Sequence, residues 1–135
     1  MSTPREGLLL FAHGARDPAW ARPFEAVLAR VRALRPEVEV RLAFLELMAP
    51  DIATAAGQLV DAGCDCVTVV PLFLGAGGHV RKDLPLLLQR LGETYPAVRF
   101  GLQPPVGEAD AVVEALARVA AGHALPPTPG PGTAS

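Results

Sequence analysis

The 135-residue sequence predicts one α/β domain, built on a four-stranded parallel sheet with helices on both faces. Three observations carry this prediction. Four short apolar runs recur along the chain, segments with helical spacing of apolar residues separate them, and half of all residues are hydrophobic while only 19% are charged. Buried strands that alternate with helices are typical of parallel sheets, and the composition favours a packed core over a disordered chain.

The strands are predicted from the apolar runs. Each run is rich in Val, Leu or Phe and ends at a loop signal, as expected of a strand that is buried on both faces. The four expected strands are Leu8–Ala12, Val38–Leu45, Cys66–Leu74 and Val98–Leu102.

The helices are predicted from apolar residues that recur every three or four positions between the strands, together with capping signals. We expect a first helix after Asp17-Pro18 with an apolar face from Phe24 to Leu34, and a second from about Pro50-Asp51 to just before Gly63. A third should extend from Lys82 to Leu91, with Pro85 in its first turn. A fourth should follow Glu108 and carry Val112, Val113, Leu116 and Val119.

The chain has the length of one domain, and residues 1–124 are expected to form it. Residues 125–135 contain four prolines, two glycines and no charge. Such a segment has little to bury, so we expect a disordered tail.

Charge and cysteine content exclude several classes of protein. The net charge is −2 and the pI is near 5.9, so the protein has no overall positive field for nucleic acid or an anionic membrane. Cys64 and Cys66 cannot form a disulfide framework, and one intervening residue is not the spacing of a zinc or redox pair. The first apolar run is too short for a signal-peptide core or a membrane span. We expect a soluble, cytoplasmic protein.

Three potential metal ligands follow three successive strands. His13, Glu46 and His79 come at or just after the carboxyl ends of the first, second and third apolar runs. In parallel sheets ligands bind beyond this edge, and two imidazoles with one carboxylate can hold a divalent transition metal while leaving positions open for a substrate. Singly, each residue is more often structural, as a hydrogen-bonding histidine or a solvated carboxylate. Together they indicate a site.

The third strand leads into a glycine-rich loop that contains Gly75, Gly77 and Gly78. Glycines let a ligand approach the backbone closely, although a flexible strand-to-helix turn explains them equally well. The loop matches neither the dinucleotide fingerprint nor the phosphate-binding loop. A serine nucleophile is excluded because the only serines are Ser2 and Ser135, at the chain ends.

Three motifs together resemble the short CbiX-type sirohydrochlorin chelatases. The motifs are H-G-A-R-D-P near the N-terminus, F-L-E-L-M-A-P-D-I in the middle and P-L-F-L-G-A-G-G-H-V-R-K-D-L-P after it, and the likeness extends over residues 8–120. These enzymes belong to the class II tetrapyrrole chelatases, which insert cobalt, iron or nickel. The resemblance implies a flavodoxin-like fold that corresponds to one half-lobe of the larger chelatases, and a role in cobalamin or sirohaem biosynthesis.

The resemblance also implies roles for individual residues. His13 and His79 would bind the metal and accept the pyrrole protons, and Glu46 would be their acidic partner. A neutral imidazole near pH 7 can do both tasks. The macrocycle would be lined by the loop residues Phe73, Leu74, Gly75, Ala76, Gly77 and Gly78.

Sirohydrochlorin carries many carboxylates, so an acidic protein needs a local basic patch to bind it. Arg16, Arg81 and Lys82 lie on the predicted rim, where bonds between cations and carboxylates are strong. The alternative is that these side chains form surface ion pairs with Asp17 and Asp83, which contribute little.

No permanently bound cofactor is expected, and the divalent metal (Co²⁺, Fe²⁺ or Ni²⁺) is a substrate. The family implies a homodimer, in which a second copy closes the site over the macrocycle. Its contact surface would be the leucine-rich third helix, with Leu84, Leu86, Leu87, Leu88 and Leu91. The competing interpretation makes four of these leucines a core stripe and leaves only Leu86 exposed.

Two other functions compete with a chelatase. A metal or tetrapyrrole carrier would bind the same ligands without turnover. A flavin or phosphate binder would use the glycine-rich loop, but one Trp, one Tyr and five Phe offer few stacking partners for a flavin.

Overall fold

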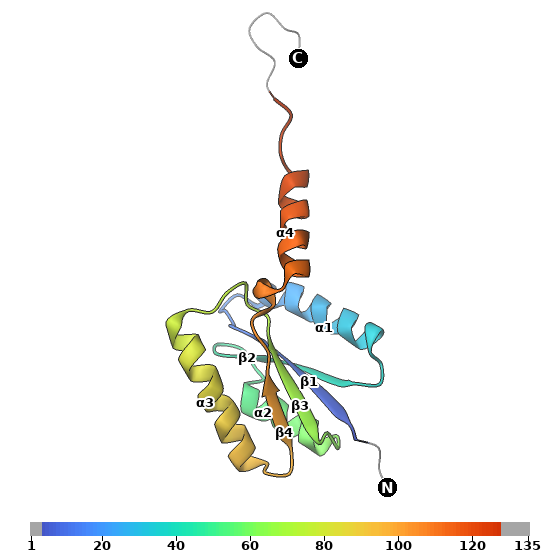
Figure 1. The fold of residues 1–135 in the computed structure, drawn as a ribbon, viewed down its shortest axis with the longest axis vertical. Coiled ribbons are helices and arrows are strands. Elements are labelled where there is room, and N and C mark those ends of the chain that lie inside the picture. The colour runs from blue at the N-terminus through green and yellow to red at the C-terminus, as the bar shows by residue number, and fades with distance from the viewer. Residues whose placement is uncertain (1–3, 128–135) are drawn as a thin grey trace, which may run out of the picture.

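A computed structural model describes residues 4–127 of the chain (Figure 1). Four parallel strands form one sheet in the order β2-β1-β3-β4. The strands are β1 (Glu6–Ala12), β2 (Glu39–Phe44), β3 (Cys66–Pro71) and β4 (Arg99–Leu102), and the helices are α1 (Arg22–Leu34), α2 (Ile52–Asp61), α3 (Gly78–Thr94) and α4 (Asp110–Gly122), with short 3₁₀ turns η1 (Pro18–Ala21) and η2 (Val106–Glu108). All four expected strands are present, and the predicted parallel α/β fold is confirmed. The expected tail lies mostly in residues 128–135, outside the described residues.

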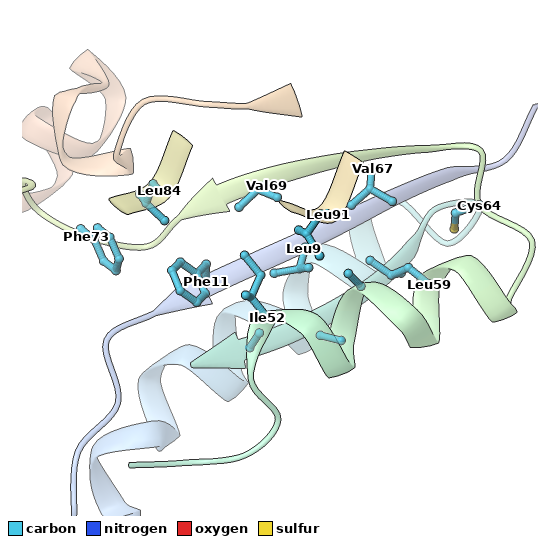
Figure 2. Packing of buried hydrophobic residues seen from close by; sticks show 13 residues of the cluster. Leu9, Phe11, Ile52, Leu59, Cys64, Val67, Val69, Phe73, Leu84 and Leu91 are labelled. Atoms are coloured by element: carbon cyan, nitrogen blue, oxygen red, sulfur yellow. The ribbon is translucent and has the colours of Figure 1, made fainter. Parts of the chain in front are cut away.

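Alternation along the central strand β1 divides the core between the two faces of the sheet. Leu9 and Phe11 point into a cluster with residues of α2 and α3, including Leu59 and Leu84 (Figure 2). Leu10 points to the opposite face, where α1 covers β1 and β2. Both faces of β1 are therefore buried, as its unbroken run of apolar residues predicts.

Local signals define the ends of α2. Asp51 precedes the helix in an extended conformation, and its Oδ1 accepts a hydrogen bond of 2.8 Å from the backbone N–H of Thr54. After the helix, Gly63 adopts φ +94°, a conformation that side chains disfavour. Asp17 likewise accepts a hydrogen bond through its side chain, from the N–H of Ala19. It therefore caps η1 and not the helix α1 that follows.

Helix α3 is longer than expected. It begins at Gly78 rather than near Lys82, so Pro85 lies inside the helix and not in its first turn. The expected start was wrong because Gly77 acts as the N-cap in an extended conformation, and the N–H of Arg81 already bonds to its carbonyl. His79 consequently lies in the first turn of α3.

The leucines of α3 belong mostly to the core. Leu84 and Leu91 are buried, Leu87 and Leu88 pack partly against the same cluster, and Leu86 alone is exposed. The competing interpretation is therefore the one that the structure supports, and α3 does not offer the apolar dimer surface that we expected.

Helix α4 extends away from the sheet (Figure 1). Only Val112 is half-buried, while Val113, Leu116 and Val119 are exposed by 52%, 48% and 64%. The predicted cover of both sheet faces is supplied by α1, α2 and α3, whereas α4 packs mainly against η2.

Candidate functional site

The three predicted metal ligands lie at one edge of the sheet, two in loops and one in the first turn of a helix. His13 follows β1 directly, Glu46 lies shortly after β2, and His79 lies just beyond the loop that follows β3. Because β1 pairs with both β2 and β3 in parallel, the carboxyl ends of these strands are neighbours. All three side chains are exposed.

The loops after β1 and β2 are fastened to each other through their backbones. The N–H of Glu46 donates to the carbonyl of His13 over 3.0 Å, and that of Leu45 donates to Ala12 over 2.8 Å. Gly14 makes this approach possible, since it adopts φ +97° and a Cβ at this position would lie 1.8 Å from the carbonyl oxygen of Glu46. Leu47 also has a left-handed backbone, with φ 65°. The glycine of the H-G-A-R motif therefore places Glu46 beside His13.

An aromatic contact joins the first loop to the third. The imidazole of His13 stacks on the ring of Phe73, with centroids 4.1 Å apart and an interplanar angle of 26°. Phe73 is only 3% exposed and packs in the core near Phe11 (Figure 2). One face of the exposed His13 ring thus rests on a fixed apolar surface. We predicted Phe73 to line the macrocycle, and its contact with His13 was not foreseen.

The glycine-rich loop leaves its backbone bare. No heavy atom lies within 4 Å of the position that a Cβ would take at Gly75, Gly77 or Gly78. Packing within the domain therefore leaves room for a side chain at each of these positions, and the backbone of the loop is open to close approach. Leu74 points out of the same loop and is 69% exposed.

The three basic rim residues differ in their partners. Arg81 donates from Nε to the carbonyl of Ala76 over 3.0 Å, and a nitrogen of its guanidinium lies 3.9 Å from Glu108. Within residues 4–127, Arg16 and Lys82 have no ion pair, and the alternative pairing with Asp17 and Asp83 does not occur. Sequence analysis missed Glu108, because nothing in the sequence links the turn after β4 to the β3–α3 loop.

The three predicted ligands do not form a ready-made metal cage. In the described part of the chain, no three His, Cys, Asp or Glu side chains converge closely enough to hold an ion. A site that must release its metal differs from a structural site, whose closed tetrahedral ligand set retains the ion. The assignment of His13, Glu46 and His79 as ligands stays a prediction.

The sequence matches the family model CbiX over residues 7–122. The chain belongs to the CbiX family. Among the curated relatives, a sirohydrochlorin cobaltochelatase from Sulfolobus acidocaldarius is 33% identical over 111 residues, which cover 82% of this chain and 85% of that protein. A sirohydrochlorin ferrochelatase from Bacillus subtilis is 30% identical over 83% of this chain but only 43% of its own length.

Solved structures agree with this membership. A CbiX protein from Marinobacter aquaeolei superposes with a TM-score of 0.78 and 31% identity, covering 87% of this chain and 95% of the other. The sirohydrochlorin chelatase SirB from Bacillus subtilis subspecies spizizenii, solved with cobalt, also gives 0.78, at 28% identity over 88% of this chain and 51% of its own. This CbiX protein thus spans nearly the whole of some relatives and about half of others.

No helix within residues 4–127 has both the length and the apolar character that a membrane crossing requires.

Proposed function

We propose that this CbiX protein inserts a divalent metal, cobalt or iron, into sirohydrochlorin. The observation that carries the proposal is its 33% identity to a sirohydrochlorin cobaltochelatase of which it covers 85%. The relative from Bacillus subtilis is named a ferrochelatase, and this supports the inclusion of iron in the proposal. Nickel stays a prediction from the sequence resemblance.

In this proposal His13 and His79 perform the proton and metal chemistry. Insertion replaces two pyrrole protons by one dication, so the enzyme must hold the metal and accept protons close to it. Both side chains are exposed at the same sheet edge, and an imidazole can ligate a metal and also accept a proton. Glu46 lies beside His13 and would lower the electrostatic cost of bringing in the dication.

The macrocycle would lie against the bare backbone of the Phe73–Gly78 loop. Arg16 and Lys82 are exposed and free to meet its carboxylates, whereas Arg81 is engaged with Ala76 and Glu108. We therefore propose that Arg16 and Lys82 bind substrate directly, and that Arg81 does so less.

The test is an anaerobic insertion assay with sirohydrochlorin and Co²⁺, Fe²⁺ or Ni²⁺ in turn. His13→Ala and His79→Ala should each slow insertion by about 10² or more, as loss of a proton-transfer group does. His123→Ala is the matched control, because His123 ends α4 and is exposed. A His13→Ala variant that is folded and fully active would refute the catalytic assignment. A wild type that binds sirohydrochlorin and metal without turnover would indicate the carrier instead.

We further propose that the active unit is a homodimer in which the two copies exchange α4. Within residues 4–127, the apolar side of this helix, with Val113, Leu116 and Val119, is about half or more exposed, and α4 packs mainly against η2. A helix of 13 residues is marginal in water without such packing.

The sheet offers a complementary bare surface. Under α1, Val40 and Leu42 are buried, but on the same face Thr68 and Val70 of β3 are only half-buried. Gly101 of β4 is exposed on this side. An α4 helix from a second copy would cover this surface, and two copies would match the length of relatives of which this chain spans about half.

A further inference from the structure

We infer that η2, acting through Gly107, is the positioning element that holds Phe73 against His13. The inference rests on the proposed role of His13 in metal insertion. It concerns a segment after β4 that contains none of the predicted metal ligands.

Gly107 and the β3–α3 loop are in direct backbone contact. A Cβ on Gly107 would lie 1.9 Å from the carbonyl oxygen of Leu74 and 2.4 Å from its carbonyl carbon and Cα. The N–H of Gly107 donates to the carbonyl of Phe73 over 3.0 Å. All the atoms in the way belong to the backbone, so a side chain at residue 107 must displace the loop itself.

The loop residues that would be displaced include Phe73, whose ring stacks on His13. Phe73 accepts the hydrogen bond through its carbonyl and stacks on His13 through its ring, so both ends of the same residue are engaged. Phe73 is also anchored beside Phe11, at a centroid distance of 6.0 Å. A shift of its backbone therefore changes the stacking geometry instead of being absorbed by a free side chain.

A second contact from η2 fastens the far end of the loop. Glu108 lies 3.9 Å from Arg81, which donates to the carbonyl of Ala76. Both charged side chains are about half or more exposed, so this pair contributes little energy. Gly107 is thus the main contact, and Glu108 with Arg81 restricts the same loop from the other side.

Such a contact matters for insertion because the imidazole must face both the metal and the pyrrole protons. A displacement of about 1 Å in a reacting group can slow a reaction by about 10². Exposure leaves His13 free to rotate unless a neighbour restrains it, and Phe73 is the aromatic ring stacked on it. Gly107 acts on the reaction only through this pair.

The experiment compares Gly107→Ala with Gly92→Ala. Gly92 lies in α3 with no heavy atom within 4 Å of its Cβ position, so the same added methyl group meets no neighbour there. We expect Gly107→Ala to lower kcat about ten-fold or more while KM for the metal changes less than about two-fold, and Gly92→Ala to change neither.

A spectroscopic measurement tests the geometry without substrate. The ring current of Phe73 should shift the imidazole protons of His13 upfield in the NMR spectrum, and His123 serves as an internal reference. In Gly107→Ala the His13 signal should move toward that of His123, as it should in Phe73→Leu. An unmoved His13 signal in a folded Gly107→Ala variant would overturn the inference.

A double-mutant cycle separates positioning from general damage to the fold. If Gly107 acts through Phe73, then Gly107→Ala should cost little further kcat in the Phe73→Leu background. Full additivity of the two losses would overturn the inference. Should His13→Ala prove active, the proposed role of His13 would fail, yet the NMR shift would still report whether Gly107 sets the ring geometry.

Discussion

His13 lies where three loops meet, and each of its contacts has a separate origin. Its carbonyl binds the N–H of Glu46, its ring stacks on Phe73, and Gly14 provides the turn that brings the second loop close. The sequence predicted the first two loops as neighbours, because residues after adjacent parallel strands share an edge. It could not predict the stacking or the contact at Gly107, which depend on how loops of irregular backbone pack.

Glu46 offers a test of charge at this site. In Glu46→Gln the side chain keeps its shape, and the backbone bond to His13 is unaffected. We expect the KM for metal to rise about ten-fold with an unchanged melting temperature, since only the attraction for the dication is lost. Glu93→Gln, near the end of α3, is the control and should leave the kinetics unchanged. Unaltered metal kinetics in Glu46→Gln would make Glu46 a structural residue.

Alanine substitutions at Gly14 and Gly63 can be compared to measure how much a close backbone contact adds to the loss of stability. Both have φ near +95°, but the nearest atom to a Cβ is at 1.8 Å for Gly14 and at 3.9 Å for Gly63. Gly63→Ala should therefore lose about 1 kcal/mol of unfolding free energy from backbone strain alone. Gly14→Ala should lose more than that and also lose insertion activity, because Glu46 must move. If urea denaturation gave equal losses of unfolding free energy for the two variants, the loop after β2 would be able to move away from residue 14 at little cost.

At the scale of whole elements, strands and helix ends were predictable where the signal is local. Asp51 and Gly63 bound α2 as expected, because a cap and a left-handed glycine are properties of a few adjacent residues. The start of α3 differs from the prediction because Gly77, which has no capping side chain, is the N-cap, and the helix holds Pro85 in its interior. Local sequence signals do not determine the position of α4, because that position depends on which surface covers its apolar side.

The cap of α2 gives a prediction about pH. Hydrogen bonding with Thr54, through its side chain and its backbone N–H, lowers the pKa of Asp51. The stabilisation is thus present above the unfolded pKa of about 3.9 and is lost as pH falls through the lower, folded pKa. At pH 7, Asp51→Ala should lower the unfolding free energy by about 1 kcal/mol, and the difference should shrink toward pH 2.

Asp51→Asn is the matched variant, since asparagine caps helices about as well as aspartate but does not titrate in this range. It should retain most of the stability at pH 7. Thermal unfolding across pH 2–7 measures all three proteins. A deficit of Asp51→Ala that stays constant over this range would mean that the carboxylate charge does not contribute to the cap.

At the scale of the whole molecule, residues 4–127 leave the apolar side of α4 and part of one sheet face uncovered. Val113, Leu116 and Val119 together present several kcal/mol of apolar burial, at about 1.5–3 kcal/mol per fully buried side chain. The family resemblance implies a homodimer, and the sequence analysis places its contact on α3. A run of leucines on a helix does not reveal whether the helix faces a core or a partner. The exposure of α4 moves the expected contact to that helix.

The proposed exchange of α4 predicts how added charge changes the oligomeric state. Wild type should have the mass of two 14.1 kDa chains in light scattering at micromolar concentration. Leu116→Asp places a carboxylate on the apolar side of α4 and should give monomers with little insertion activity. Ala121→Asp adds the same charge on the other side of the helix and should remain dimeric.

Thr68→Glu tests the other half of the contact. It adds charge to the bare face of β3 and leaves α4 unaltered, so it should dissociate the dimer only if α4 of one copy packs on the sheet of the other. A dimeric Thr68→Glu together with a monomeric Leu116→Asp would instead indicate that two α4 helices pair with each other. A wild type with the mass of one chain and full activity would refute the exchange, because the exposed α4 would then be dispensable for a complete site.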